Sequence, residues 1–135
     1  MSTYFEQTEM NLKQNDLNYF QQEFDIHLPE NYKQLILKYN GGYTNNNEYF
    51  DTLKSIKFGE VKVEDTIKNH QIIENNIPIN FLPIANDFSD NIICLNLQNG
   101  EDYGKIYCFY FDVDKLEKIA NSLEELLGVN SIDEL

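Results

Sequence analysis

The sequence predicts a single α+β domain, with helices packed on one face of a largely antiparallel sheet. Apolar residues recur at helical spacing, between capping residues, in the first half of the chain and again near its end. Residues 81–111 hold two runs of large apolar residues around a glycine-containing loop, which is typical of an antiparallel hairpin. A chain of 135 residues, 41% hydrophobic and 24% charged, is large enough for one domain with its own core.

Two helices are predicted in the first third of the chain, after a polar N-terminal tail over residues 1–14. Asp16 can cap the first helix, which is expected to end within residues 25–28. Pro29 suits the first position of the second helix, and Gly41 suits its end. The apolar stripes expected to be buried are Leu17, Phe20 and Phe24 in the first helix and Tyr32, Leu35, Ile36 and Tyr39 in the second.

The middle of the chain is predicted to form short secondary-structure elements. After a polar loop over residues 43–48, residues 49–53 and 55–58 are predicted as short strands around a bend. Apolar spacing and acidic residues in the first turn predict a helix over residues 63–73. The remaining elements before the hairpin are a connector over residues 75–80, a strand over 81–85 and a polar turn over 86–90.

The hairpin predicted within residues 91–111 has a register in which Leu97 faces Lys105 and Cys94 faces Cys108. Side chains alternate between the two faces, and we expect helices on the larger, more apolar face. The other face is expected to be partly covered or used for binding. A slip of one residue would exchange the faces. The larger face carries Ile93, Leu95, Leu97, Tyr107, Phe109 and Phe111, and the other carries Ile92, Cys94, Asn96, Ile106, Cys108 and Tyr110.

The last part of the chain predicts a turn over residues 112–115, a short strand over 116–120 and a final helix. Ser122 and Glu125 form a capping box at the start of that helix, and Gly128 closes it. Residues 129–135 are expected to be a short acidic tail. The single domain therefore covers residues 1–135, with a core over about residues 16–128.

The net charge of −13 limits the classes of partner. Binding to a phosphate backbone needs clustered Lys or Arg, and no basic cluster is present, so we do not expect nucleic-acid binding. The same charge repels anionic membranes and attracts basic proteins. The alternative is that the acidity only keeps the domain soluble.

The sequence carries no secretion signal, lipidation motif or apolar run of about 20 residues, so we expect a cytoplasmic protein. Cysteines rarely pair in that compartment. Cys94 and Cys108 are therefore expected to be buried thiols, although the predicted register would bring them face to face.

No motif in the sequence indicates catalysis. It has no glycine-rich phosphate loop and no nucleophile elbow, and His27 and His70 lie in different predicted elements outside any ligand motif. Three pairs of carboxylates lack the spacing of a complete calcium loop and are typical of turns. They are Asp87 with Asp90, Glu101 with Asp102, and Asp112 with Asp114. We expect no metal and no cofactor, and a small hydrolase that uses one carboxylate pair is kept as an alternative.

Acidic pairs and tyrosines are the candidate residues for binding a partner. All three acidic pairs lie at ends of the predicted hairpin or of its flanking strand, so we expect a shared acidic patch. Tyrosine is favoured at interface hot spots, although each of these tyrosines could also be an ordinary core or rim residue. The candidates are Tyr43, Asp87, Asp90, Glu101, Asp102, Tyr103, Asp112 and Asp114, with Tyr110 as a further aromatic anchor.

Three segments in a fixed order resemble the SUKH superfamily, named in part after yeast cell-wall regulators of the Smi/Knr type. They are IHLPENYKQLILKYNGG over residues 26–42, FLPIANDFSDNIICLNL over residues 81–97 and KIANSLEELL over residues 118–127. The resemblance spans about residues 16–128. Relatives commonly carry a Trp after the hairpin strand, where this chain reads Tyr107 to Asp112 without one, so their binding sites are not carried over.

The resemblance implies an α+β fold without enzymatic activity. In bacteria it implies an immunity protein that silences a cognate toxin domain, often a nuclease, by stoichiometric occlusion. A nuclease surface that holds phosphate is basic, which suits an acidic partner. Fungal relatives regulate wall assembly through protein contacts, so an intracellular scaffold or regulator without a toxin is the alternative. We expect a basic toxin domain as the partner and a monomer or weak homodimer.

Overall fold

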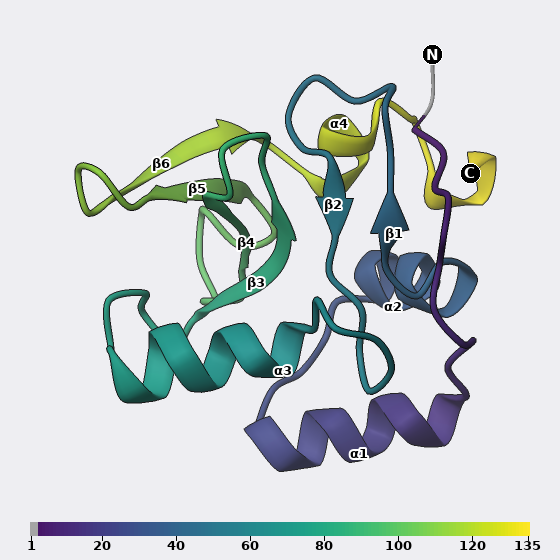
Figure 1. The fold of residues 1–135 in the computed structure, drawn as a ribbon, viewed down its shortest axis with the longest axis horizontal. Coiled ribbons are helices and arrows are strands. Elements are labelled where there is room, and N and C mark those ends of the chain that lie inside the picture. The colour runs from purple at the N-terminus through teal and green to yellow at the C-terminus, as the bar shows by residue number, and fades with distance from the viewer. Residues whose placement is uncertain (1–2) are drawn as a thin grey trace.

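The computed structural model describes residues 3–135 and confirms the α+β class (Figure 1). The helices are α1 (Gln14–Phe24), α2 (Glu30–Lys38), α3 (Val63–Thr66) and α4 (Leu123–Leu127), with a π-helical segment η1 (Ile67–Ile73) and a 3-10 segment η2 (Ile132–Glu134). The strands are β1 (Gly42–Tyr43), β2 (Thr52–Leu53), β3 (Phe81–Asn86), β4 (Ile92–Asn96), β5 (Ile106–Tyr110) and β6 (Lys115–Ala120).

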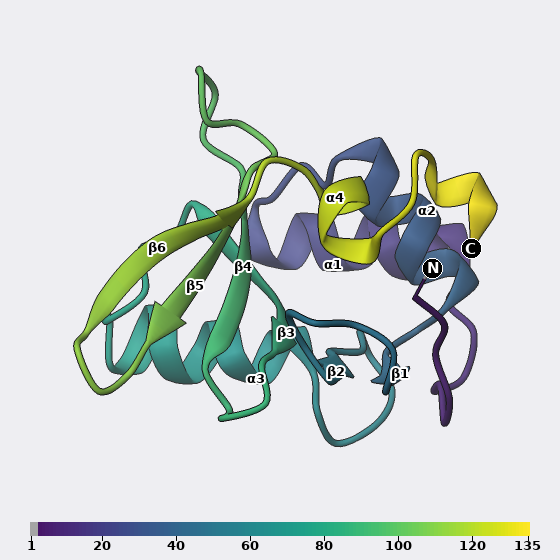
Figure 2. The same ribbon diagram turned by 90° about the horizontal axis from the view of Figure 1, so that it is seen from above.

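The six strands form one antiparallel meander in the order β1-β2-β3-β4-β5-β6. Only the connection between β2 and β3 contains a helix, formed by α3 and η1. The sheet twists so strongly that β5 and β6 run across the direction of β1 and β2 (Figures 1 and 2). Because neighbouring strands alternate in direction, the β3–β4 and β5–β6 turns share one end of the sheet, and the β4–β5 loop lies at the other.

The main core lies between α1, α2 and α4 and one face of the sheet (Figure 2). A second, smaller cluster forms on the opposite face, where Ile77 packs with Ile92, Cys94 and Phe109. The fully buried side chains of the main core include Leu17, Tyr32, Leu35, Ile36, Leu82, Ile84, Ile93, Leu95, Ile106, Leu123 and Leu127.

The predicted register of the hairpin is wrong by one residue. Leu95 faces Ile106, and Cys94 faces Tyr107 rather than Cys108. The cause is Asn96, which is buried: its side-chain nitrogen donates to Asp102 O at 3.1 Å, and its side-chain oxygen accepts from Gln98 N at 3.0 Å. The loop therefore closes on Asn96, as the bond from Gly104 N to Asn96 O (2.8 Å) shows.

The shift exchanges the faces of β5. Ile106 and Cys108 face the helices together with Ile93 and Leu95, whereas Phe109 lies on the opposite face with Cys94. Cys94 and Cys108 are thus on opposite faces, and both are free, buried thiols. Burial raises the pKa of Cys108 to about 12 and raises that of Cys94 further.

The N-terminal segment, expected as a tail, packs against the domain from residue 3 onward. The Thr3 hydroxyl donates to Leu127 O at 2.9 Å, and Glu6 pairs with Tyr43 through two backbone hydrogen bonds of 2.8 Å. Leu12 is also buried in the main core. The expected C-terminal tail likewise contains η2, whose Ile132 is buried.

The helix ends differ from prediction at α1 and α2. Pro29 is the N-cap of α2 rather than its first residue, and the C-cap of α2 is Tyr39 rather than Gly41. Asp16 occupies the third position of α1 rather than its cap, and its carboxylate accepts from Lys13 N at 2.8 Å. Ser122 caps α4 as predicted, accepting from Glu125 N at 3.0 Å. The predicted helix over residues 63–73 is present as α3 and η1, which begins in the main core at Val63.

Candidate partner-binding surface

The β3–β4 and β5–β6 turns lie side by side at one end of the sheet. The two turns are joined because the Asn91 side-chain oxygen accepts from Phe111 N at 3.2 Å. Asp90 and Asp114 both have positive φ, 63° and 54°, a conformation that Asp tolerates at turns. The turns therefore hold their outward-pointing residues on a defined backbone.

The two acidic residues of the β3–β4 turn have different roles. The Asp87 carboxylate accepts from Ser89 N (2.9 Å), Asn91 N (2.8 Å) and the Asn91 amide (3.1 Å), so it builds the turn. Asp90, Asp112 and Asp114 are exposed, and their carboxylates make no hydrogen bond or ion pair with any part of the chain that the structure describes. These three carboxylates are available to an external cation.

Exposed apolar side chains accompany these carboxylates. Phe88 is 60% exposed, Val113 is 54% exposed and Phe111 is 41% exposed. We call the set formed by Phe88, Asp90, Phe111, Asp112, Val113 and Asp114 the turn-end surface.

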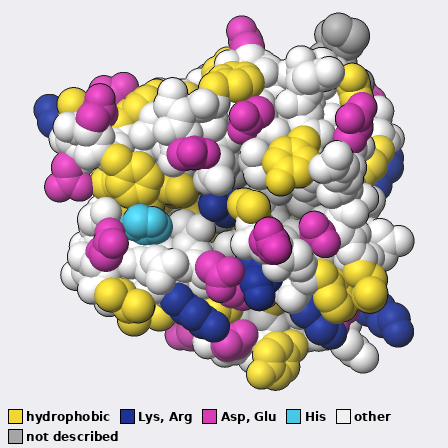
Figure 3. Space-filling model, in the orientation of Figure 1, with side chains coloured by type: hydrophobic (Ala, Val, Ile, Leu, Met, Phe, Trp, Pro, Cys, Tyr) yellow, Lys and Arg dark blue, Asp and Glu magenta, His cyan; other side chains and the backbone are white. Residues whose placement is uncertain are grey.

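The end of η1 borders the turn-end surface. The His70 ring lies 5.1 Å from the Phe111 ring, and its Nδ1 lies 3.2 Å from the Glu74 carboxylate. Figure 3 shows apolar side chains gathered beside a histidine, with carboxylates spread around them. Apolar contact area framed by unpaired charges is the usual composition of a protein interface.

The eight predicted candidates do not form one surface. Glu101, Asp102 and Tyr103 lie on the β4–β5 loop, at the opposite end of strands that are roughly 16 Å long. Asp102 is also paired with Lys105 at 3.1 Å. Tyr43, 48% exposed, lies on β1, three strand positions and about 14 Å from β4. Only Asp87, Asp90, Asp112 and Asp114 are brought together.

Sequence reasoning missed a buried lysine on the same face of the sheet as Cys94. Lys54 follows β2 and is only 4% exposed, yet its ammonium group makes no hydrogen bond or ion pair with any described residue. Burial lowers the pKa of Lys54 to about 8, although Cys94, Asp65 and Asp90 favour its charged form. The surrounding sequence, Asp51 to Phe58, carries no pattern that marks this position as buried.

The structure shows no assembled metal site and no membrane-spanning helix within residues 3–135. No three His, Cys, Asp or Glu side chains of these residues gather as metal ligands. None of the helices in this range combines the length and apolarity needed to cross a bilayer.

The order of elements, with helices before an antiparallel meander and a capped helix after it, can be compared with known families. The family model of SMI1 / KNR4 (SUKH-1) matches residues 11–128, which is most of the chain. The chain belongs to the SMI1/KNR4 family. Comparison with curated proteins gives no match.

Membership of the SUKH-1 family supports a role like that of an immunity protein, in a family that is generally non-catalytic. The turn-end surface lies inside the matched segment, as does Asn96, which sets the hairpin register. The match ends at Gly128, before η2.

Proposed function

We propose that this SUKH-1 protein is an immunity protein that neutralises a cognate toxin domain by binding it one to one. The observation that carries the proposal is the turn-end surface, where three unpaired carboxylates frame exposed Phe88, Phe111 and Val113. Such a surface suits a basic partner with an apolar centre, because apolar contact provides affinity and complementary charge provides orientation. A nuclease domain fits this chemistry, since it must hold phosphate.

The net charge of −13 supports the same partner class. A strongly acidic protein attracts a basic domain over several ångströms, which raises the rate of association at low ionic strength. Occlusion needs no chemical step by the immunity protein, and the Asp87 carboxylate is occupied by hydrogen bonds within its own turn. We therefore propose a non-catalytic inhibitor.

The test is calorimetry with the C-terminal domain of the protein encoded immediately upstream, at low and high salt. We expect a one-to-one complex that weakens as salt screens the charges. The variant D90N/D112N/D114N should weaken binding by about tenfold or more at low salt, because Asn keeps the turn conformation and removes the charge. The matched control is E101Q/D102N at the opposite end of the sheet, which should bind like the unchanged protein.

Other results of this test would indicate catalysis, a scaffold role, a different binding site or a different partner. Neutralisation below a one-to-one ratio would contradict occlusion and indicate catalysis. Tight binding without salt dependence would favour a scaffold with an uncharged interface. Loss of binding only in the E101Q/D102N control would move the site to the β4–β5 loop, and absence of binding at both salt concentrations would reject this toxin as the partner.

A further inference from the structure

Glycine follows asparagine at two positions of the chain, after Asn40 and after Asn99. An asparagine in this setting can lose its amide nitrogen without an enzyme, because glycine has no side chain to shield the backbone nitrogen that attacks the amide carbon. The reaction needs an asparagine side chain that can turn, a glycine nitrogen that is free to attack, and water. The structure places the two pairs in opposite environments.

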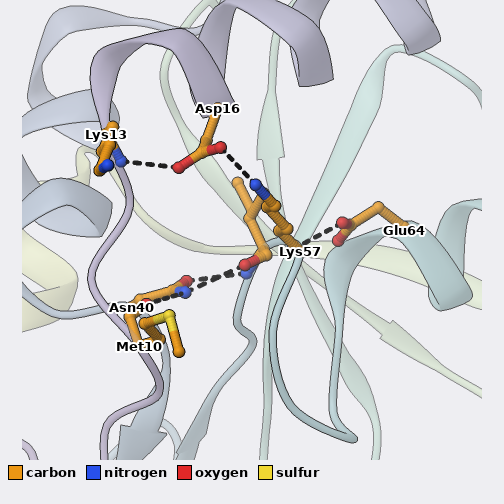
Figure 4. Close-up of polar contacts among 7 residues, drawn as sticks. Met10, Lys13, Asp16, Asn40, Lys57 and Glu64 are labelled. Carbon is orange, nitrogen blue, oxygen red and sulfur yellow. Dashed lines mark hydrogen bonds and ion pairs between the residues drawn. The ribbon is translucent and has the colours of Figure 1, made fainter.

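The pair formed by Asn40 and Gly41 is closed to this reaction. Asn40 is 0% exposed. Its side-chain nitrogen donates to Ile56 O at 3.0 Å and to Met10 O at 2.9 Å, and its side-chain oxygen accepts from Ile56 N at 2.8 Å (Figure 4). Gly41 N is also occupied, because it donates to Tyr39 O at 3.0 Å. The Asn40 amide therefore cannot turn toward Gly41 N unless this part of the core opens.

The pair formed by Asn99 and Gly100 is open to the reaction. It lies in the β4–β5 loop, which projects beyond the end of the sheet (Figure 2). Both residues are exposed. Within residues 3–135, neither the Asn99 side chain nor Gly100 N makes a hydrogen bond. A Cβ added to Gly100 would meet nothing within 4 Å, so there is room around the attacking nitrogen.

The bonds that hold the β4–β5 loop do not involve the Asn99 side chain. Asn96 O accepts from Gly104 N at 2.8 Å. The Asn96 side chain bonds to Asp102 O at 3.1 Å and to Gln98 N at 3.0 Å. Because these bonds can persist while the Asn99 amide turns, the reaction does not require the domain to unfold.

We propose that Asn99 is a site of spontaneous covalent modification in the folded protein, and that the fold protects Asn40 from the same reaction. Gly100 N attacks Asn99 Cγ, and the new C–N bond closes a succinimide ring. The side-chain nitrogen leaves as ammonia, taking the proton from Gly100 N. Water then adds to either ring carbonyl, breaks its bond to the ring nitrogen, and yields aspartate or isoaspartate. The proposal is independent of the proposed immunity function.

The modification changes both the charge and the backbone of the loop. One negative charge is added beside Glu101 and Asp102, and isoaspartate also places the former side-chain methylene in the main chain. The new carboxylate of isoaspartate is a methyl acceptor for enzymes that transfer a methyl group from S-adenosylmethionine to isoaspartyl residues. The β4–β5 loop would thus present a substrate for this class of methyltransferase.

The test is incubation of the full chain at neutral pH, folded and in guanidinium chloride, followed by peptide mass mapping. We expect Asn99 to convert at nearly the same rate in both samples. Asn40 should convert about a hundredfold more slowly in the folded sample than in guanidinium chloride, because only molecules with an open core can react. A purified isoaspartyl methyltransferase with labelled S-adenosylmethionine should label the peptide that contains Asn99.

Two variants and a control locate the reaction. N99S removes the amide and should abolish conversion in this loop. G100A keeps the amide but shields the attacking nitrogen, so it should slow conversion of Asn99 by about tenfold. N130S removes another exposed asparagine and should leave the rate at Asn99 unchanged. Thermal melting confirms that each variant is folded.

Absence of conversion at Asn99 in the folded chain, or equal rates at Asn40 and Asn99 in that chain, would overturn the proposal. The same ratio of the two rates in guanidinium chloride would show that neighbouring residues, rather than the fold, cause the difference, and would overturn the protection of Asn40. An unchanged rate at Asn99 in folded G100A would overturn the attack by Gly100 N.

Discussion

At the scale of single residues, Lys54 is the clearest departure from ordinary packing. It is 4% exposed, and its ammonium group makes no hydrogen bond or ion pair with residues 3–135, so this group has lost most of its contact with water without gaining a direct partner. Its pKa falls from 10.5 to about 8 for this reason. At neutral pH the ammonium group is still charged, so the folded state includes the unfavourable free energy of removing this charge from water.

This cost predicts that K54M stabilises the protein at pH 7. The pKa of Lys54 is lower in the folded chain, so between about pH 8 and pH 10.5 the unfolded chain holds more protons and stability rises with pH. The shift corresponds to about 3 kcal/mol. We expect K54M to be more stable by up to about that amount at pH 7, and the advantage to shrink across this pH window.

Urea denaturation of both proteins at several pH values measures the difference. Comparing the two chains is necessary because the raised pKa values of the cysteines act in the opposite direction above pH 9. A constant difference between pH 7 and pH 10 would show that Lys54 is not the titrating group. Lower stability of K54M at pH 7 would show that the ammonium group makes a favourable contact.

At the scale of elements, helices were easier to predict than strand pairing. Local signals define α2 and α4, because Pro29 and Ser122 act within one turn of their own position. The hairpin register depends on the Asn96 side chain, and no sequence pattern marks this role. Asn96 closes the β4–β5 loop one residue before the predicted position. One residue of shift was enough to separate the cysteines.

Site prediction met the same limit. Acidic and aromatic residue types identified Asp87, Asp90, Asp112 and Asp114, which the meander brings together. Phe88 and Val113 carry no sequence signal of a binding site, because single apolar residues in polar turns are common on protein surfaces.

The pairing of the N-terminal segment with β1 predicts a large cost for G42A. Gly42 has a φ of 123°, and an added Cβ would lie 2.8 Å from Glu6 O. Gly100 has a similar φ of 135°, with nothing within 4 Å of an added Cβ. We expect G100A to cost about 1 kcal/mol or more through backbone strain alone. G42A should cost about 2 kcal/mol more, because it also disrupts the two bonds between Glu6 and Tyr43.

Thermal or urea denaturation of the two glycine variants measures this difference, with G100A as the matched control. Equal costs would show that the segment before α1 contributes nothing to stability. Increased proteolysis of the N-terminal segment in G42A, and not in G100A, would place the effect at the contact with Glu6.

At the scale of the whole molecule, the edges of the sheet and the net charge predict a monomer. Glu6 pairs with β1 at one edge. The other edge is β6, where Lys115, Glu117 and Lys118 are exposed, and charged side chains discourage pairing between edges. A net charge of −13 adds repulsion between copies. Sedimentation velocity should give one species of monomer mass at all concentrations. A dimer that forms as the concentration rises, and that is lost when a proline is placed in β6, would contradict this prediction.

The bond between Thr3 and Leu127 also determines when the fold can be completed during synthesis. The strands β3 to β6 pair with neighbours along the chain and can form as soon as they leave the ribosome. The N-terminal segment is translated before the rest of this domain, but it can pack only after α4 is made, because the acceptor of Thr3 is 124 residues further on. We expect the N-terminal segment of the nascent chain to stay unpacked until α4 has been translated. Protection of this segment from protease should therefore report when folding of the domain is complete.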